Sequence, residues 1–89
     1  MKASTLFDDP KVRHAVAEKE LEAAERINRL TKTQIKVLAL ITDGILNKNV
    51  AHALGISQRT IENHRKAIME RTGCKTFVEL VRLTVLAGV

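Results

Sequence analysis

The 89-residue sequence contains no tryptophan or tyrosine, one cysteine, one proline and four glycines. A single cysteine excludes an intrachain disulfide framework. Because proline and glycine are scarce while good helix formers dominate, the composition favours an all-helical fold. The sequence also has no apolar run of about 18 residues and no signal-peptide pattern. We therefore expect a cytoplasmic protein that does not span a membrane.

The sequence also lacks the arrangements that carry catalysis. It has no Ser/His/Asp or Cys/His constellation, no paired-carboxylate motif and no phosphate-binding glycine loop. The three histidines, His14, His52 and His64, have no partners at metal-ligand spacing. We therefore predict no catalytic residue, no metal site and no cofactor. Cys74 is expected to be a small buried apolar side chain, with a redox sensor as the alternative.

Positive charge, by contrast, is in excess. The formal net charge is +5, and most of the excess lies between residues 47 and 75. The basic residues there are Lys48, Arg59, Arg65, Lys66, Arg71 and Lys75, against only Glu62 and Glu70. Residues 8–30 are nearly balanced in charge. A small domain with a local basic excess favours an anionic partner, either nucleic acid or an acidic membrane surface.

Helix start and stop signals divide the chain into a lead-in and five helices. Asp9 is a suitable N-cap, with Pro10 at the first position of a helix over residues 11–29. A capping box of Thr31 and Gln34, supported by a hydrophobic staple of Leu30 and Ile35, begins the next helix. We predict that Val37, Leu38 and Ile41 form the buried face of this helix. Gly44 is expected to end it.

Three shorter segments follow the same rules. Asn47 is expected to cap a helix over residues 47–54, and Ser57 to start a basic helix over residues 57–71. Thr76 and Glu79 form a second capping box for a last helix that ends near residue 87. No alternation typical of strands and no internal repeat is present.

The helix over residues 11–29 has one narrow apolar stripe. Its members are Val16, Ala17, Leu21, Ala24 and Ile27. A stripe this narrow suits either pairing with another helix or packing within its own chain. Self-association and an intrachain or linker role therefore both remain open.

Residues 47–68 satisfy the requirements of a helix-turn-helix, in which two helices cross closely through a short turn. Ala51 supplies the small residue at the crossing, and Gly55 can adopt the positive φ that the turn needs. Ser57 caps the second helix and leaves its positive end near a phosphate. The apolar residues expected to join the two helices are Val50, Leu54, Ile56 and Ile61.

The second helix of this motif separates into two faces at 100° per residue. Ile61, Ile68 and Thr72 point inward, with His64 at their flank. Its outward face would enter the major groove, where Asn63 can bind adenine, Lys66 guanine and Glu62 cytosine. Glu62 could instead be a solvated surface charge. The predicted base-contacting residues are Arg59, Glu62, Asn63 and Lys66. The predicted contacts to the DNA backbone are Asn47, Lys48, Ser57, Thr60, His64, Arg65 and Arg71.

These residues resemble the LuxR/GerE helix-turn-helix family over residues 30–89. The resemblance rests on Leu30-Thr31, Val37-Leu38, Gly44, Asn47-Lys48, Val50-Ala51, Leu54, Ile56-Ser57, Thr60-Ile61, His64 and Ile68. Ser-Gln-Arg-Thr-Ile-Glu-Asn-His-Arg at 57–65 and Glu-Leu-Val-Arg-Leu-Thr-Val-Leu-Ala-Gly at 79–88 resemble the FixJ-like branch of response regulators. Thr33 and Gln34 depart from the Arg and Glu usual there, so an ion pair of the family is expected to be missing.

The resemblance implies a four-helix LuxR-type domain that binds DNA as a dimer, with the last helix contributing to the dimer contact. By position, Glu62, Asn63 and Lys66 match base-contacting residues of the family, and Lys48, Thr60 and Arg65 match residues that contact the DNA backbone. The expected organisation is a lead-in and linker or dimerisation helix at 1–29 and a DNA-binding domain at 30–89. The residues predicted to form the dimer are Val16, Leu21, Ile27, Val81 and Val85.

Two hypotheses for function follow. The first is a sequence-specific DNA-binding transcriptional regulator, a homodimer on double-stranded DNA, with RNA polymerase or another regulator as further candidate partners. The second is a protein-interaction module that pairs with another regulator through its first or last helix. This hypothesis is favoured by Glu62 and Glu70, the acidic residues on the face of the helix that would contact DNA. The residues before the motif are too few for a receiver domain, so the sequence represents either a stand-alone regulator or a fragment.

Overall fold

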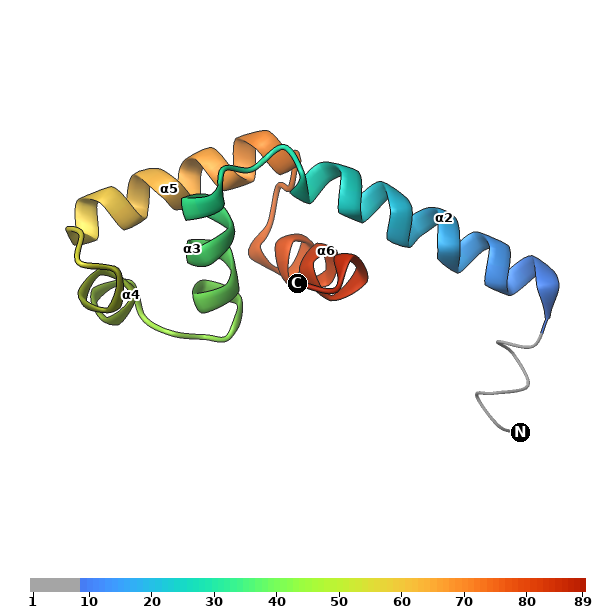
Figure 1. Ribbon diagram of the computed structural model, residues 1–89, viewed down its shortest axis with the longest axis horizontal. Coiled ribbons are helices and arrows are strands. Elements are labelled where there is room, and N and C mark those ends of the chain that lie inside the picture. Colours follow the sequence, from blue (N-terminus) through green and yellow to red (C-terminus); the bar gives the residue numbers. More distant parts are fainter. Residues whose placement is uncertain (1–8) are drawn as a thin grey trace.

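The computed structural model describes residues 9–89, and this part of the chain consists of helices without strands (Figure 1). The helices are α2 (Pro10–Ile27), α3 (Lys32–Thr42), α4 (Asn47–Leu54), α5 (Gln58–Thr72) and α6 (Phe77–Ala87). The prediction of an all-α fold is confirmed, and the lead-in expected before residue 9 lies outside the described residues. None of these helices is both long and apolar enough to cross a membrane.

Most helix starts follow from the local sequence. The carboxylate of Asp9 accepts a hydrogen bond from the backbone N–H of Lys11 at 2.8 Å, and Pro10 is in the first turn, as predicted. The capping box of α3 is complete: Thr31 Oγ1 accepts from the N–H of Gln34 at 3.1 Å, and Gln34 Oε1 accepts from the N–H of Thr31 at 3.0 Å. These bonds satisfy N–H groups that the first turn of a helix leaves without partners.

Two predicted caps are wrong in detail. Leu46, not Asn47, occupies the N-cap position of α4, and no side chain caps this helix. The Asn47 side chain instead accepts a hydrogen bond from Arg65, 18 residues away. At α6, the N–H of Glu79 binds Thr76 Oγ1 as predicted, but the Glu79 carboxylate accepts from the N–H of Lys75 rather than closing the box on Thr76.

The core lies where α3, α4, α5 and α6 meet. The predicted buried residues Val37, Leu38 and Ile41 of α3 are at most 2% exposed. They form one cluster with Val50, Ala51, Ile61, Ile68, Leu80 and Leu83 from the other three helices. Burial of this apolar surface is the main force that holds such short helices together, since helices of this length are marginal in isolation.

The α2 helix adds to this core through its C-terminal half. Ala23 and Ile27 are 1% and 4% exposed and belong to the core cluster, and α2 packs mainly on α6. Leu21 is 62% exposed, because it lies two positions from Ala23 and so faces roughly the opposite side of the helix. Ile27, which was predicted at a dimer contact, thus packs in the core of its own chain. The N-terminal end of α2 extends beyond α6 (Figure 1).

Hydrogen bonds fasten α2 to the C-terminal end of α5. Arg26 Nε donates to the carbonyl oxygen of Thr72 at 2.6 Å, and Arg26 Nη2 lies 3.6 Å from Cys74 Sγ. Arg29 and Arg71 form a reciprocal pair, each donating from its guanidinium to the other's carbonyl oxygen at 3.4 and 3.3 Å. Cys74 is buried as predicted, at 6% exposure.

Candidate nucleic-acid interface

The helix-turn-helix consists of α4, a tight turn and α5. Ala51 is 5% exposed at the crossing, and its carbonyl oxygen accepts from the N–H of Ile56 at 3.0 Å. Gly55 has a φ of 68°, the left-handed conformation that the turn was predicted to need. The small residue and the glycine together let α4 and α5 pack closely, and they determine the angle between these two helices.

The N-terminal end of α5 is capped and exposed. Ser57 Oγ accepts from the N–H of Thr60 at 3.0 Å, and the two hydroxyl groups share a hydrogen bond at 2.8 Å. The other N–H groups of the first turn remain oriented outward with the positive end of the helix dipole. An anion such as a phosphate is therefore favoured at this end of α5.

The two faces of α5 are separated as predicted. Ile61 and Ile68 are fully buried and Thr72 is 1% exposed, while His64 at their flank is half-buried. All members of the opposite face are exposed, and among the described residues none of them forms a salt bridge. They are Arg59, Glu62, Asn63, Lys66 and Glu70. Their donors and acceptors are therefore free to meet the edges of base pairs.

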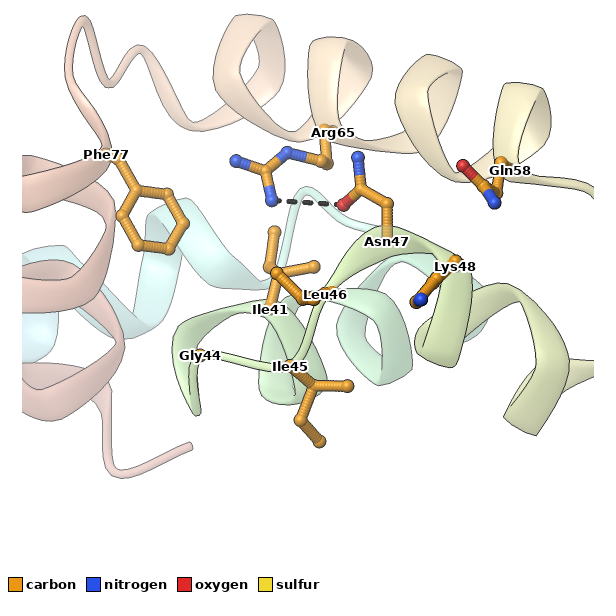
Figure 2. A pocket seen from close by; sticks show the side chains of 9 residues that line it. All are labelled: Ile41, Gly44, Ile45, Leu46, Asn47, Lys48, Gln58, Arg65 and Phe77. Atoms are coloured by element: carbon orange, nitrogen blue, oxygen red, sulfur yellow. Dashed lines mark hydrogen bonds between the residues drawn. The ribbon is translucent and has the colours of Figure 1, made fainter.

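An open groove lies beside α5, between the first turn of α4 and the start of α6 (Figure 2). Its volume is ≈ 570 Å³. Ile41 and Leu46 contribute apolar surface, while Lys48 is exposed at its α4 side. The groove thus combines apolar surface with cationic groups beside α5.

The structure gives two of the predicted backbone-contacting arginines partners inside the protein. Arg65 is half-buried, donates to Asn47 Oδ1 at 3.3 Å and lies with its guanidinium carbon 5.2 Å from the centre of the Phe77 ring. Arg71 is exposed but donates to the carbonyl oxygen of Arg29. These partners could not be predicted from the sequence, since each lies on a different helix or in an interhelical segment.

The α6 helix presents an apolar face to solvent. Val78 and Val85 are 66% and 73% exposed, Phe77 is 39% exposed, and Val81 is half-buried beside them. Together with Arg82, these residues line a shallow depression with a volume of ≈ 350 Å³. We call Phe77, Val78, Val81 and Val85 the α6 face. Val81 and Val85 were predicted at a dimer contact, whereas Phe77 was not, although the spacing of 77, 81 and 85 already indicates one side of a helix.

No group of three or more histidine, cysteine or acidic side chains comes together in the part of the chain that the structure describes. The exposed part of the helix-turn-helix consists instead of one helix, α5, with polar side chains and flanking cations. Such a surface is suited to binding a polymer by its edges and phosphates.

Comparison with known proteins identifies this arrangement. Residues 28–84 match the GerE family model of bacterial regulatory proteins. The chain belongs to the luxR family. This family consists of regulators rather than enzymes, and the match covers α3 to α5 and most of α6.

Individual luxR-family relatives are transcriptional regulators. The transcriptional regulatory protein FixJ of Azorhizobium caulinodans is 40% identical over 68 residues, which are 76% of this chain and 32% of FixJ. The C4-dicarboxylate transport transcriptional regulatory protein DctR of Rhodobacter capsulatus is 35% identical over 72 residues, 81% of this chain and 36% of DctR. The chain thus spans about a third of the length of these relatives.

The fold agrees with a solved structure. Full-length FixJ from B. japonicum superposes with a TM-score of 0.73 at 32% identity, over 92% of this chain and 39% of that FixJ chain. Because this coverage exceeds the family match, the likeness extends into α2. The resemblance inferred from the sequence is confirmed, and the family supports a role for this chain in DNA binding and transcription regulation.

Proposed function

We propose that this chain is a sequence-specific DNA-binding transcriptional regulator that inserts α5 into the major groove of double-stranded DNA and acts as a homodimer. The observation that carries the proposal is the exposed row of unpaired polar side chains on α5, which lies opposite a fully buried apolar row. An α-helix of this kind fits the width of the major groove, where each base pair presents a distinct set of donors and acceptors.

The base contacts are assigned by side-chain chemistry. Asn63 can bind adenine with two hydrogen bonds, Lys66 donates to guanine O6 and N7, and Glu62 accepts from cytosine N4. Arg59 lies one turn nearer than Asn63 to the N-terminal end of α5, where it is placed to bind a further guanine. Each well-formed pair contributes about 1–3 kcal/mol of discrimination against the wrong base.

The DNA backbone is bound by groups that flank α5. Lys48 is exposed beside the uncapped first turn of α4, so its ammonium and the free N–H groups of that turn can bind one phosphate. Ser57, Thr60 and the N-terminal end of α5 offer a second anion site. His64 lies half-buried at the edge of α5, where its ring can bind a third phosphate. These contacts position the domain without specifying sequence.

The homodimer uses the α6 face. An exposed patch of one phenylalanine and three valines is unfavourable in water, and a two-fold axis lets one such patch cover its own copy. Val16 and Leu21 on α2 are available for a second contact, since neither is buried within the chain. A symmetric dimer places two α5 helices on two half-sites about one helical turn, or a multiple of it, apart.

A selection experiment tests this proposal. The purified chain is incubated with a pool of random duplexes, and the bound DNA is recovered and sequenced. Asn63→Ala/Lys66→Ala removes the central base contacts. The matched control, Asn28→Ala/Lys32→Ala, removes the same chemical groups from exposed positions outside α5. We expect wild type and control to enrich one motif with two half-sites, and the α5 variant to lose it.

The opposite result also has a clear meaning. A folded wild-type protein that enriches no sequence, with an affinity that does not change with salt, would overturn the proposal. DNA binding requires a salt slope of about −0.9 for every phosphate that the protein neutralises. The remaining role would then be a protein-interaction module, in which the α6 face or the exposed side of α2 binds another regulator. RNA polymerase is a candidate partner for the dimer on DNA.

A further inference from the structure

Arg65 differs from the other cations near α5 in its surroundings. Lys48 is exposed, whereas Arg65 is half-buried in the groove and extends from α5 between Asn47 and Phe77 (Figure 2). One guanidinium nitrogen donates to the Asn47 side chain, and the guanidinium carbon is 5.2 Å from the centre of the Phe77 ring. One side chain thus contacts three helices: α4 at its first turn, α5 on which it lies, and α6 at its first residue.

Both contacts depend on the planar guanidinium. A cation within about 6 Å of an aromatic ring centre is attracted by the negative face of the ring, and arginine also stacks on it. The same group donates within its plane to Asn47. A phosphate ligand would have to compete with these two partners for the guanidinium. The first turn of α4, which Asn47 begins, has no side-chain cap.

We propose that Arg65 is a positioning residue rather than a phosphate contact. Arg65 fixes the first turn of α4 against α5 and, through the Phe77 ring, joins both to the α6 face. This inference rests on the proposed DNA-binding function, because the groups that it positions are the phosphate-binding end of α4 and the base-contacting helix α5.

The position of Phe77 gives this contact a consequence for assembly. Phe77 lines the groove on one side and the α6 face on the other. When a second copy covers the α6 face, water is excluded from the ring, and the attraction between the ring and Arg65 becomes stronger. Dimer formation and the placement of α4 and α5 therefore support each other.

The test compares Arg65→Met with Lys48→Met. Both variants lose one positive charge beside the same groove and keep an unbranched side chain. Their affinities are measured by fluorescence anisotropy, over a range of salt concentrations, on a duplex with the sequence enriched in the selection and on a scrambled duplex of the same length. A lost phosphate contact weakens binding to both duplexes equally and makes the salt slope shallower by about 0.9.

We expect Lys48→Met to show that behaviour. Arg65→Met is expected to weaken binding to the enriched sequence about threefold, with little change in affinity for the scrambled duplex. Its salt slope should not show the change of about 0.9 that marks a lost phosphate contact. Phe77→Leu should have the same effect as Arg65→Met, and the double variant should be no weaker than either single variant. If Arg65→Met behaves as Lys48→Met does, or if its effect and that of Phe77→Leu simply multiply, Arg65 is not a positioning residue.

A second measurement is independent of DNA. Urea unfolding of the wild type, the two single variants and the double variant forms a thermodynamic cycle for Arg65 and Phe77. A non-zero coupling supports the tie between α5 and α6 even if the enriched sequence is never found, in which case only the proposed function fails. Zero coupling overturns the tie, whatever the protein binds.

Discussion

The attachment of α2 to α5 gives the sharpest prediction of stability. Arg26 Nε donates to the carbonyl oxygen of Thr72 at 2.6 Å. Thr72 is the last residue of α5, so this carbonyl has no partner within its own helix. Thr72 is 1% exposed, and the Arg26 side chain is only 26% exposed, so water replaces this donor poorly. The substitution to make is Arg26→Met, which keeps the apolar stem and removes the donors.

The expected cost follows from these contacts. A hydrogen bond to a charged donor contributes about 1.5–3 kcal/mol, and a buried carbonyl left without a partner costs about 1–3 kcal/mol. These two figures describe the same event from two sides and are not added. Because Arg26 is partly exposed, we expect Arg26→Met to lower the free energy of unfolding by about 2 kcal/mol. In a domain of this size that corresponds to a Tm about 8–16 °C lower.

Urea unfolding followed by far-ultraviolet circular dichroism measures this loss. Glu22→Gln is the matched control, since Glu22 Oε1 lies 3.9 Å from Arg26 Nη1 and the Glu22 side chain is 70% exposed. Exposed pairs contribute little, so this control should change stability by less than about 0.5 kcal/mol. An Arg26→Met variant as stable as Glu22→Gln would refute the reasoning, because it would mean that water satisfies the Thr72 carbonyl at no cost.

Three further variants test the core, the turn and the dimer. Ile61→Ala should cost about 2–5 kcal/mol in urea unfolding, because Ile61 is fully buried; a loss below 1 kcal/mol would contradict this. Gly55→Ala should cost about 1–2 kcal/mol, since a Cβ there meets no atom within 4 Å and only the positive φ opposes it; a stabilised variant would mean that the turn rearranges. Val85→Asp should weaken the dimer in sedimentation velocity and leave monomer stability within about 0.5 kcal/mol, whereas an unchanged dimer would exclude the α6 face.

The parts of the fold that could be predicted from sequence are those that neighbouring residues decide. Thr31 with Gln34, and Ser57 with Thr60, form caps within one helical turn, so their spacing in the sequence is enough. Gly55 in the turn follows from its backbone freedom. The two faces of α5 follow in the same way, because burial of Ile61 and its helical neighbours determines which side remains exposed.

The predictions that differ from the structure concern side chains whose partners lie far away in the sequence. Asn47 is a good cap by type, but its side chain binds Arg65, and α4 begins without a side-chain cap. In α2 the predicted apolar stripe included Leu21, which is exposed, whereas the small Ala23 is buried on the side of the helix that packs in the core. The apolar stripe therefore included Ile27, which lies in the core, but omitted Ala23 and included the exposed Leu21.

The exposed polar residues of the site were predictable as a set, but the separate roles of the arginines were not. Sequence position places Arg59, Arg65 and Arg71 on one basic helix and treats all three as DNA contacts. Their roles differ because a long side chain can reach another helix. The guanidinium of Arg65 reaches α4 and α6, and that of Arg71 reaches the segment after α2. Of these three arginines, only Arg59 forms no hydrogen bond, ion pair or ring contact within the described part of the chain, so its guanidinium remains available.

These contacts fix α5 at two points along its length. Arg65 holds the middle of α5 against α4 and α6, and Arg26 and Arg29 hold its C-terminal end against α2. The N-terminal end of α5, with Ser57 at its cap, is left exposed. A change in the angle between α2 and α5 must therefore either break the bond from Arg26 to Thr72 or move the end of α5 with it. The helix that begins before the family match is, in this physical sense, part of the machinery that orients α5.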